Sequence, residues 1–243
     1  MILKSSLFMQ FDKIRFGFST KLFNYKNSPF FSNMSFEIGD DRQKVFENRK
    51  LFADKLNIDF NYVAYQHQIH SDIITYVENP GFVGDADAMY TDKKNLALAV
   101  GSADCNTIFF YDTKKEVIAA IHSGWRGTHK RIAEKTIYAL QEKFSSKPEN
   151  IFAYMPPAIT YLNYQVGKDV SEKFSNKFVH KIGDSIYIDV TKANYTMLLN
   201  AGIPAEQIQV SNLCSFANAN LFHSYRRDKE NSGRAWGMIY MVK

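Results

Sequence analysis

Between Asn61 and Ser123 the chain consists of short apolar runs separated by turn-forming residues such as Asn79-Pro80-Gly81. The runs are rich in β-branched and aromatic residues, which favour strands over helices. Aromatic residues make up 15% of the whole chain, which adds to this preference for sheet. The pattern predicts strands at residues 62–65, 73–77, 86–90, 96–100, 107–111 and 117–121.

Helical patterns flank this sheet-forming stretch on both sides. Asp40 or Asp41 caps a predicted helix that reaches about Leu56, with an apolar face formed by Val45, Phe46, Phe52 and Leu56. A second helix is predicted to open at Gly124, and its apolar face contains Ile132, Thr136, Ile137, Leu140 and Phe144. Further helices are predicted near 167–176 and 191–200, and further strands at 14–19, 151–155, 208–211 and 235–242. Helices around a sheet-rich middle predict layered α/β packing.

Length and charge limit the classes of protein that fit. No repeat or linker divides the 243 residues, so we expect a single domain over residues 1–243. No apolar run has the length of a membrane span or of a signal peptide, so we expect a cytoplasmic protein without a membrane partner. The 30 basic residues exceed the 25 acidic ones by only five, and the longest basic cluster is His129-Lys130-Arg131. We therefore expect no nucleic-acid partner, whereas anionic small molecules suit this charge.

Several common enzyme motifs are missing from the sequence. It has no G-x-G-x-x-G, Walker A, H-E-x-x-H or G-x-S-x-G motif, and no zinc deaminase signature. Two cysteines, Cys105 and Cys214, cannot make a disulfide framework, and we expect Cys214 to be structural. The six histidines are also too few for the trinuclear copper cluster of a multicopper oxidase.

Three candidate metal ligands lie where predicted strands meet turns. His70 precedes the strand 73–77, Cys105 lies between 96–100 and 107–111, and His122 ends the strand 117–121. Strand ends can meet at one sheet edge, so these side chains could form a zinc site with an open fourth position. The alternative is a buried cysteine and two hydrogen-bonded histidines. His67 competes with His70, because the two face opposite ways on an extended chain; His129, His180 and His223 are taken as surface or structural residues.

The segment Gly124-Trp125-Arg126-Gly127-Thr128 is a candidate anion site. Glycines at a helix start leave backbone N–H groups available to an anion, and Arg126 could add a bidentate contact to a phosphate. The alternative is an ordinary helix start with Thr128 as its N-cap.

These segments resemble the YfiH-like purine nucleoside enzymes, a family also described as laccase-domain or multicopper polyphenol oxidase proteins. The resemblance covers nearly the whole chain. The motifs that carry it are Phe18-Ser19-Thr20-Lys21, Asn33-Met34-Ser35 with Ile38-Gly39-Asp40-Asp41, Glu47-Asn48-Arg49, Gln68-Ile69-His70, Asp85-Ala86-Asp87-Ala88 with Thr91-Asp92, Ser102-Ala103-Asp104-Cys105, His122 to Gly127, Leu221 to Arg227, and Gly233-Arg234.

The resemblance implies a four-layer α/β/β/α sandwich with mixed sheets and a zinc ion bound by His70, Cys105 and His122. It implies phosphorolysis of adenosine, inosine and methylthioadenosine to free base and ribose-1-phosphate, with adenosine deamination as a side activity. Cys105, His122 and Asp104 are then the expected catalytic residues, and Lys21, Asn33 and Arg126 the expected phosphate-binding residues. The expected partners are purine nucleosides and phosphate, and relatives suggest a homodimer.

The sequence departs from the family pattern around the expected substrate site. Lys21 replaces an arginine, which keeps the charge but loses the planar fork. Pro156-Pro157 stands where the family has Gly-Pro, Leu162-Asn163 replaces a pair of cysteines, and residues 22–32 replace a glycine-rich loop. These departures affect the rim of the substrate site more than the metal ligands.

Three alternatives from other classes stay open. Two histidines and one cysteine are also the in-plane ligands of a blue-copper centre, with Met89 as the axial ligand of a copper-dependent polyphenol oxidase. Cys105 and His122 could instead form the nucleophile and base of a metal-free hydrolase acting on peptidoglycan precursors, since the family fold resembles a toxin deamidase with such a pair. The third alternative is a non-catalytic binding module.

Overall fold

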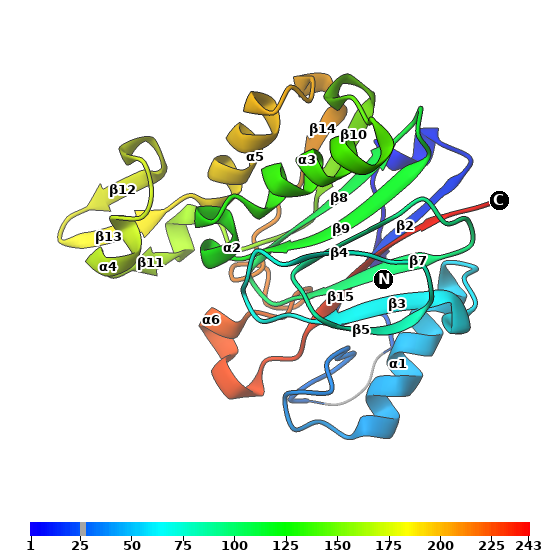
Figure 1. The fold of residues 1–243 in the computed structure, drawn as a ribbon. Helices are drawn as coiled ribbons and strands as arrows, with labels where there is room; N and C mark the ends of the chain where they lie inside the picture. Colours follow the sequence, from blue (N-terminus) through cyan, green and yellow to red (C-terminus); the bar gives the residue numbers. More distant parts are fainter. Residues whose placement is uncertain (25–27) are drawn as a thin grey trace.

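Two six-stranded sheets pack face to face, and helices cover their outer faces (Figure 1). The computed structural model describes residues 1–24 and 28–243. One outer layer is α1 (Arg42–Lys55), and the other contains α3 (Ile132–Phe144) and α5 (Val190–Asn200). The layer order is therefore α/β/β/α, which confirms the expected four-layer fold.

Sheet I has the strand order β1-β2-β15-β7-β3-β5. Strand β3 pairs in parallel with β5 and β7, whereas β15 pairs antiparallel with β2 and β7. The strands are β1 (Ile2–Leu3), β2 (Ile14–Ser19), β3 (Val63–His67), β5 (Gly81–Asp85), β7 (Ala97–Ser102) and β15 (Ala235–Met241).

Sheet II has the strand order β14-β10-β8-β9-β6-β4. Strand β8 pairs antiparallel with β9 and β10, while the outer pairs β4·β6 and β10·β14 are parallel. The strands are β4 (Ile74–Tyr76), β6 (Ala88–Thr91), β8 (Asn106–Asp112), β9 (Val117–Ser123), β10 (Ile151–Met155) and β14 (Ile208–Val210).

The alternation along β8 explains why the middle of the strand, residues 108–111, is apolar on both faces. Phe109 and Tyr111 belong to the core between the two sheets, while Ile108 and Phe110 belong to the core beneath α3 and α5. Every residue of β8 is buried, because both faces of sheet II are covered. The sheets approach so closely that a Cβ at Gly237 would overlap the ring of Phe109.

The helix predicted to reach Leu56 forms as α1, and Asp41 caps it by accepting a 3.0 Å hydrogen bond from the Lys44 amide. Phe46 is the exception on the predicted apolar face, because it is not buried. Its side chain is 43% exposed and packs only at the margin, against Phe60 with 5.5 Å between ring centroids.

The helix predicted to open at Gly124 is two helices. Residue Arg131 adopts a left-handed conformation with a φ of 63°, which separates α2 (Trp125–His129) from α3. Thr128 lies inside α2 and is not its N-cap, so that alternative is wrong; Gly124 holds the cap position.

The region around residues 165–190 also differs from the prediction. In place of a helix at 167–176 there is only α4 (Lys168–Ser171), beside a small sheet with order β11-β13-β12. Its strands are β11 (Gln165–Val166), β12 (Val179–Ile182) and β13 (Ser185–Ile188). These strands are too short for a reliable sequence pattern, and they form around a separate apolar cluster that includes Phe174, Phe178 and Ile188.

The remaining elements are short. They are α6 (Tyr225–Asp228) and the 3-10 turns Phe8–Gln10, Phe60–Tyr62, Pro148–Asn150, Tyr161–Asn163, Asn176–Phe178, Ala205–Gln207 and Lys229–Asn231. The segment 22–32, which stands in place of the family's glycine-rich loop, includes residues 25–27, which lie outside the described part of the chain. Within residues 1–24 and 28–243, no helix has the length and apolar character needed to cross a bilayer.

Candidate metal centre and its cavity

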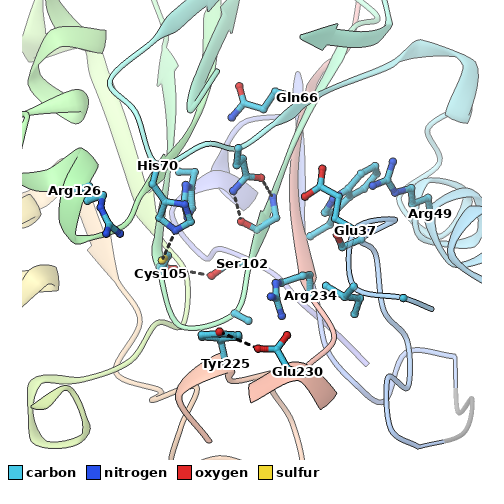
Figure 2. A pocket seen from close by; sticks show the side chains of 18 residues that line it. Glu37, Arg49, Gln66, His70, Ser102, Cys105, Arg126, Tyr225, Glu230 and Arg234 are labelled. Carbon is cyan, nitrogen blue, oxygen red and sulfur yellow. Dashed lines mark hydrogen bonds between the residues drawn. The ribbon is translucent and has the colours of Figure 1, made fainter. Parts of the chain in front are cut away.

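His70, Cys105 and His122 meet at one end of the two sheets. His70 lies in the bend after β3, Cys105 in the connection from β7 to β8, and His122 near the end of β9. Their candidate ligand atoms all lie within 4.8 Å of one another, and Cys105 Sγ is 3.9 Å from His70 Nε2. Figure 2 shows the His70 ring directed at the Cys105 sulfur.

The donor set fits a divalent metal ion such as zinc. Bond lengths of about 2.0–2.3 Å place the ligand atoms of a tetrahedral zinc roughly 3–4 Å apart, so the three side chains need only small movements to share one ion. The backbone at Gly124 lies close to the side chains of Cys105 and His70, which is possible because glycine has no Cβ. A Cβ at Gly124 would lie 2.9 Å from the Cys105 sulfur and 3.2 Å from His70 Cδ2.

Asp87 orients two of the three candidate ligands, His122 and His70, through hydrogen bonds. Its Oδ1 accepts hydrogen bonds from His122 Nδ1 at 2.7 Å and from the His70 amide at 3.1 Å. Its Oδ2 accepts from the amide and hydroxyl of Ser71. This arrangement leaves Nε2 of His122 directed at the shared position, which is how a carboxylate commonly supports a metal-bound histidine.

The charges of Cys105 and His122 stabilise each other. Burial alone would raise the pKa of the Cys105 thiol, but the adjacent His122 and the hydrogen bonds from both histidines lower it to about 6. Burial would lower the pKa of His122, but the Cys105 thiolate and the bond to Asp87 raise it to about 9. The metal-free site therefore favours a thiolate beside an imidazolium, and the thiolate is the form that binds metal or attacks an electrophile.

The carboxylate of Asp104, which the resemblance makes an expected catalytic residue, accepts hydrogen bonds from the C-terminal part of the chain. It accepts hydrogen bonds from Ser215 Oγ at 2.6 Å, Ser224 Oγ at 3.0 Å and the Arg226 amide at 2.7 Å. Its backbone has a φ of 84°, which turns the chain sharply before Cys105. These hydrogen bonds connect the turn before Cys105 to the start of α6.

A cavity of about 700 Å³ opens beside the metal ligands (Figure 2). Its volume suits a small organic ligand. Its walls come from both sheets, the loop before α1 and the segment around α6. The lining residues are Ser35, Glu37, Ile38, Gly39, Arg49, Gln66, Gln68, His70, Gly101, Ser102, Ala103, Cys105, His122, Arg126, Tyr225, Glu230, Arg234 and Trp236.

The three residues expected to bind phosphate do not lie together. Arg126 lines the cavity, with its guanidinium over the Trp125 ring. Lys21 lies outside the lining, where its ammonium contacts the Ala219 carbonyl and the Phe31 ring. Asn33 is fully buried, and its amide bonds to Ser35, Asp40 and the Arg234 backbone.

The remaining candidate ligands lie away from the metal group. His67 pairs with Asp85, 2.8 Å away on the next strand, so His70 and not His67 joins the cluster. His223 is buried, His129 contacts the Lys173 carbonyl, and His180 stacks on Tyr161. Met89 is buried in the core between the sheets and does not line the cavity. Cys214 is buried and accepts a hydrogen bond from the Thr160 amide.

Sequence reasoning missed Asp87, Arg49 and Gln66. Asp87 and Arg49 occur in the motifs that carry the family resemblance, but no role was assigned to them. For Arg49 a signal was available, since it lies four residues after Val45 and three before Phe52 on the apolar face of a predicted helix. A cation in that position must either find a buried partner or face a cavity.

Comparison with known proteins identifies the family of the chain. The family model described as multi-copper polyphenol oxidoreductase laccase matches residues 15–242. The chain belongs to this laccase-like YfiH family. Among YfiH-family relatives, "Purine nucleoside phosphorylase YlmD" of Bacillus subtilis is 31% identical, covering 93% of this chain and 87% of the relative. "Purine nucleoside phosphorylase YfiH" of Shigella flexneri is 32% identical, covering 92% of each chain.

Solved structures of YfiH-family proteins share the fold over almost the whole chain. The crystal structure of the Bacillus licheniformis hypothetical protein YfiH has a TM-score of 0.93 at 31% identity, covering 100% of this chain and 96% of that one. The crystal structure of YlmD from Geobacillus stearothermophilus has a TM-score of 0.92 at 28% identity, covering 98% and 94%.

Proposed function

We propose that this protein is a zinc-dependent purine nucleoside phosphorylase. It would cleave adenosine, inosine and methylthioadenosine to the free base and ribose-1-phosphate, with adenosine deamination as a side activity. The observation that carries the proposal is the cluster of His70, Cys105 and His122, supported by Asp87, at the wall of a cavity of about 700 Å³. Relatives that match most of the chain bear the name purine nucleoside phosphorylase.

His70, Cys105 and His122 would hold the zinc ion, and Asp87 would keep the His122 ring in place. A zinc ion with an open position supplies Lewis acidity and an activated water. Arg126 would neutralise an anion in the cavity. Asp104 would hold the turn that presents Cys105, and Lys21 and Asn33 would support the wall behind the cavity.

The proposed phosphorolysis balances without a redox partner. A phosphate oxygen forms a bond to ribose C1′ as the bond from C1′ to purine N9 breaks. The electron pair of that bond goes to N9, which takes up the proton that the hydrogen phosphate loses on becoming the ester. The cationic side chains at the cavity favour this reaction because they stabilise the phosphate in place of the water that it leaves.

The direct test is to purify the protein, measure its bound metal, and assay each nucleoside with and without phosphate. We expect zinc, phosphate-dependent release of base, and formation of ribose-1-phosphate. A His122→Ala variant should lose at least about 100-fold in activity because it loses a ligand, whereas His129→Ala, which changes an exposed histidine, should keep it. Copper in place of zinc, with visible absorption and oxygen uptake on phenols, would favour the polyphenol oxidase suggested by the family description.

One observation also favours a second candidate, a metal-free cysteine hydrolase. Asp87, His122 and Cys105 form a relay in which the thiol has a pKa of about 6 and the imidazole bonds to a carboxylate. Such a pair could attack an amide of a peptidoglycan precursor. Activity that survives complete removal of metal and disappears on alkylation of Cys105 would support the hydrolase. If activity is lost when the metal is removed and returns when zinc is added, the hydrolase is contradicted.

A further inference from the structure

Arg234 is a half-buried cation in the cavity wall, and its guanidinium has unused donors. Nη1 donates to the carbonyls of Ser232 at 2.7 Å and Gly233 at 3.1 Å. Among residues 1–24 and 28–243, the guanidinium makes no other hydrogen bond and has no carboxylate within 4.0 Å. Its Nε and Nη2 are therefore available to a ligand.

The backbone at Arg234 is held by the loop that precedes α1. The Arg234 amide donates to Asn33 Oδ1 at 2.9 Å, and the Arg234 carbonyl accepts from the Met34 amide at 2.9 Å. Gly233 is packed so closely that a Cβ there would overlap the ring of His223. Together with the two bonds from Nη1, these contacts fix the guanidinium before a ligand arrives, which lowers the cost of binding.

The guanidinium lies in the part of the cavity next to the candidate metal ligands. Its central carbon is 5.4 Å from the centroid of the Tyr225 ring, and Figure 2 shows Arg234 between Ser102 and Tyr225. Burial lowers the pKa of Arg234, although the charge of Cys105 is near enough to oppose this shift. Because arginine stays protonated in proteins, an anionic ligand would offset the cost of burying this charge.

Arg234 is better placed than the other arginines of the cavity to contact an anion directly. Arg126 is exposed and packs on the ring of the residue before it, and Figure 2 shows it on the opposite side of the candidate metal ligands. Arg49 is enclosed by the rings of Phe36 and Trp236, each 4.1 Å from its guanidinium. A half-buried guanidinium forms stronger hydrogen bonds than an exposed one, because water competes less.

We propose that Arg234 binds the phosphate substrate in this cavity. The proposal rests on the proposed function, in which phosphate attacks ribose C1′. Nε and Nη2 form one edge of the planar guanidinium and donate in parallel to two phosphate oxygens, the geometry in which arginine recognises phosphate. Asn33, expected to bind phosphate, then acts indirectly: it is buried outside the cavity lining and holds the backbone of Arg234.

The test measures the KM for phosphate and the KM for nucleoside separately in the metal-loaded enzyme. Arg234→Met removes the charge and the fork of donors but keeps a long side chain. It should raise the KM for phosphate on the order of 10- to 100-fold, as expected for loss of a charged hydrogen bond. The KM for nucleoside should change less than about threefold, because the loss is confined to phosphate binding. An unchanged KM for phosphate would overturn the proposal.

The matched control is Lys229→Gln. Lys229 is a cation near the same Tyr225 ring, 6.0 Å from its centroid, but it is exposed and outside the cavity lining. Its loss should leave both KM values unchanged, and a rise in the KM for phosphate equal to that of Arg234→Met would overturn the assignment. If Arg234→Met fails to fold, Arg234→Gln, which keeps a donor for the two carbonyls, decides by the same criteria.

Calorimetric titration with inorganic phosphate separates this inference from the proposed function. If the wild-type protein releases no base but binds phosphate, and Arg234→Met does not, the subsite stands and the phosphorylase does not. Equal phosphate binding by both proteins, or none by either, overturns the subsite whatever the activity.

Titration with adenosine 5′-monophosphate distinguishes the source of the phosphate group. We expect it to bind wild-type protein no more tightly than adenosine does. Binding tighter than that of adenosine and of inorganic phosphate, with the difference lost in Arg234→Met, would assign Arg234 to the phosphate of a nucleotide and overturn inorganic phosphate as its ligand.

Discussion

Asp87 is a buried carboxylate that organises the cluster of candidate metal ligands. Its two oxygens accept hydrogen bonds from the His122 ring, the His70 amide and Ser71. A single side chain therefore connects the end of β9 to the bend after β3. Burial would raise the pKa of Asp87, but the bond to His122 and its charge keep that pKa below the usual range. The carboxylate is therefore ionised at neutral pH and compensates the charge at the site.

Replacing Asp87 with Asn should weaken metal binding by about 10- to 100-fold, because His122 loses the acceptor that fixes its ring. Competition with a chromophoric chelator measures this affinity. Asp85→Asn is the matched control, since Asp85 belongs to the same motif but pairs with the half-exposed His67. Equal affinity in the two variants would show that Asp87 does not support the metal.

At the scale of elements, α5 supports the connection from β9 to α2 that carries the metal site. Asn194 of α5 is fully buried and accepts from Ser123 Oγ at 2.9 Å, while its Nδ2 donates to Thr128 Oγ1 at 3.0 Å. These bonds hold the residues on both sides of Gly124. Helix α5, which is distant in sequence, thus fixes the turn at Gly124. The absence of a Cβ at Gly124 leaves room for Cys105 and His70.

An Asn194→Ala variant should lose about 1–3 kcal/mol of unfolding free energy, because it leaves buried hydroxyl groups without partners. Urea denaturation followed by circular dichroism measures the loss. Asn200→Ala at the exposed end of the same helix should change stability by less than about 0.5 kcal/mol. If the two variants are equally stable, the Asn194 network does not stabilise this junction.

On the scale of the whole molecule, the candidate metal ligands join the two sheets. His70 follows β3 of sheet I, Cys105 lies between β7 of sheet I and β8 of sheet II, and His122 belongs to β9 of sheet II. An ion shared by these residues binds the folded state only, because the unfolded chain does not bring them together. Metal binding should therefore stabilise the entire sandwich.

Removing the metal with a chelator should lower the melting temperature, and adding zinc should restore it. At a free zinc concentration of 100 times the Kd, the stabilisation is about 2.7 kcal/mol. Differential scanning fluorimetry measures the shift. Cys105→Ser should lose most of it, whereas Cys214→Ser, outside the metal group, should retain it. A shift that persists in Cys105→Ser would place the stabilising metal elsewhere.

The core between the sheets is the other feature that unites the molecule. Phe109 is fully buried there and fits against the bare backbone of Gly237. Phe109→Ala should cost about 3–5 kcal/mol of unfolding free energy, since the rigid sheets cannot close the void. Phe82→Ala, at a position 62% exposed on the edge strand β5, should cost far less. Urea denaturation of both variants checks this, and similar midpoints would contradict the assigned core.

The sequence by itself determined most strands of the two large sheets, the principal helices and the identity of the candidate metal ligands, but not the short strands β1, β5, β11, β12 and β13. Runs of β-branched and aromatic residues and helical spacing reflect local backbone preferences, so β8, β9 and α1 could be predicted from neighbouring residues. The layer order and the ligand roles followed from the resemblance to a family, and the structure brings His70, Cys105 and His122 together.

Only the tertiary structure decided which polar side chains face the cavity. A glutamine on β3 or an arginine on α1 has the same local pattern whether it lies in a core, in water or beside a ligand. The role of Asp87 depends on contacts with His122 and His70, which are far from it in the chain, and these contacts exist only after the two sheets pack. Burial and hydrogen bonding are properties of that packing, which no short stretch of sequence contains.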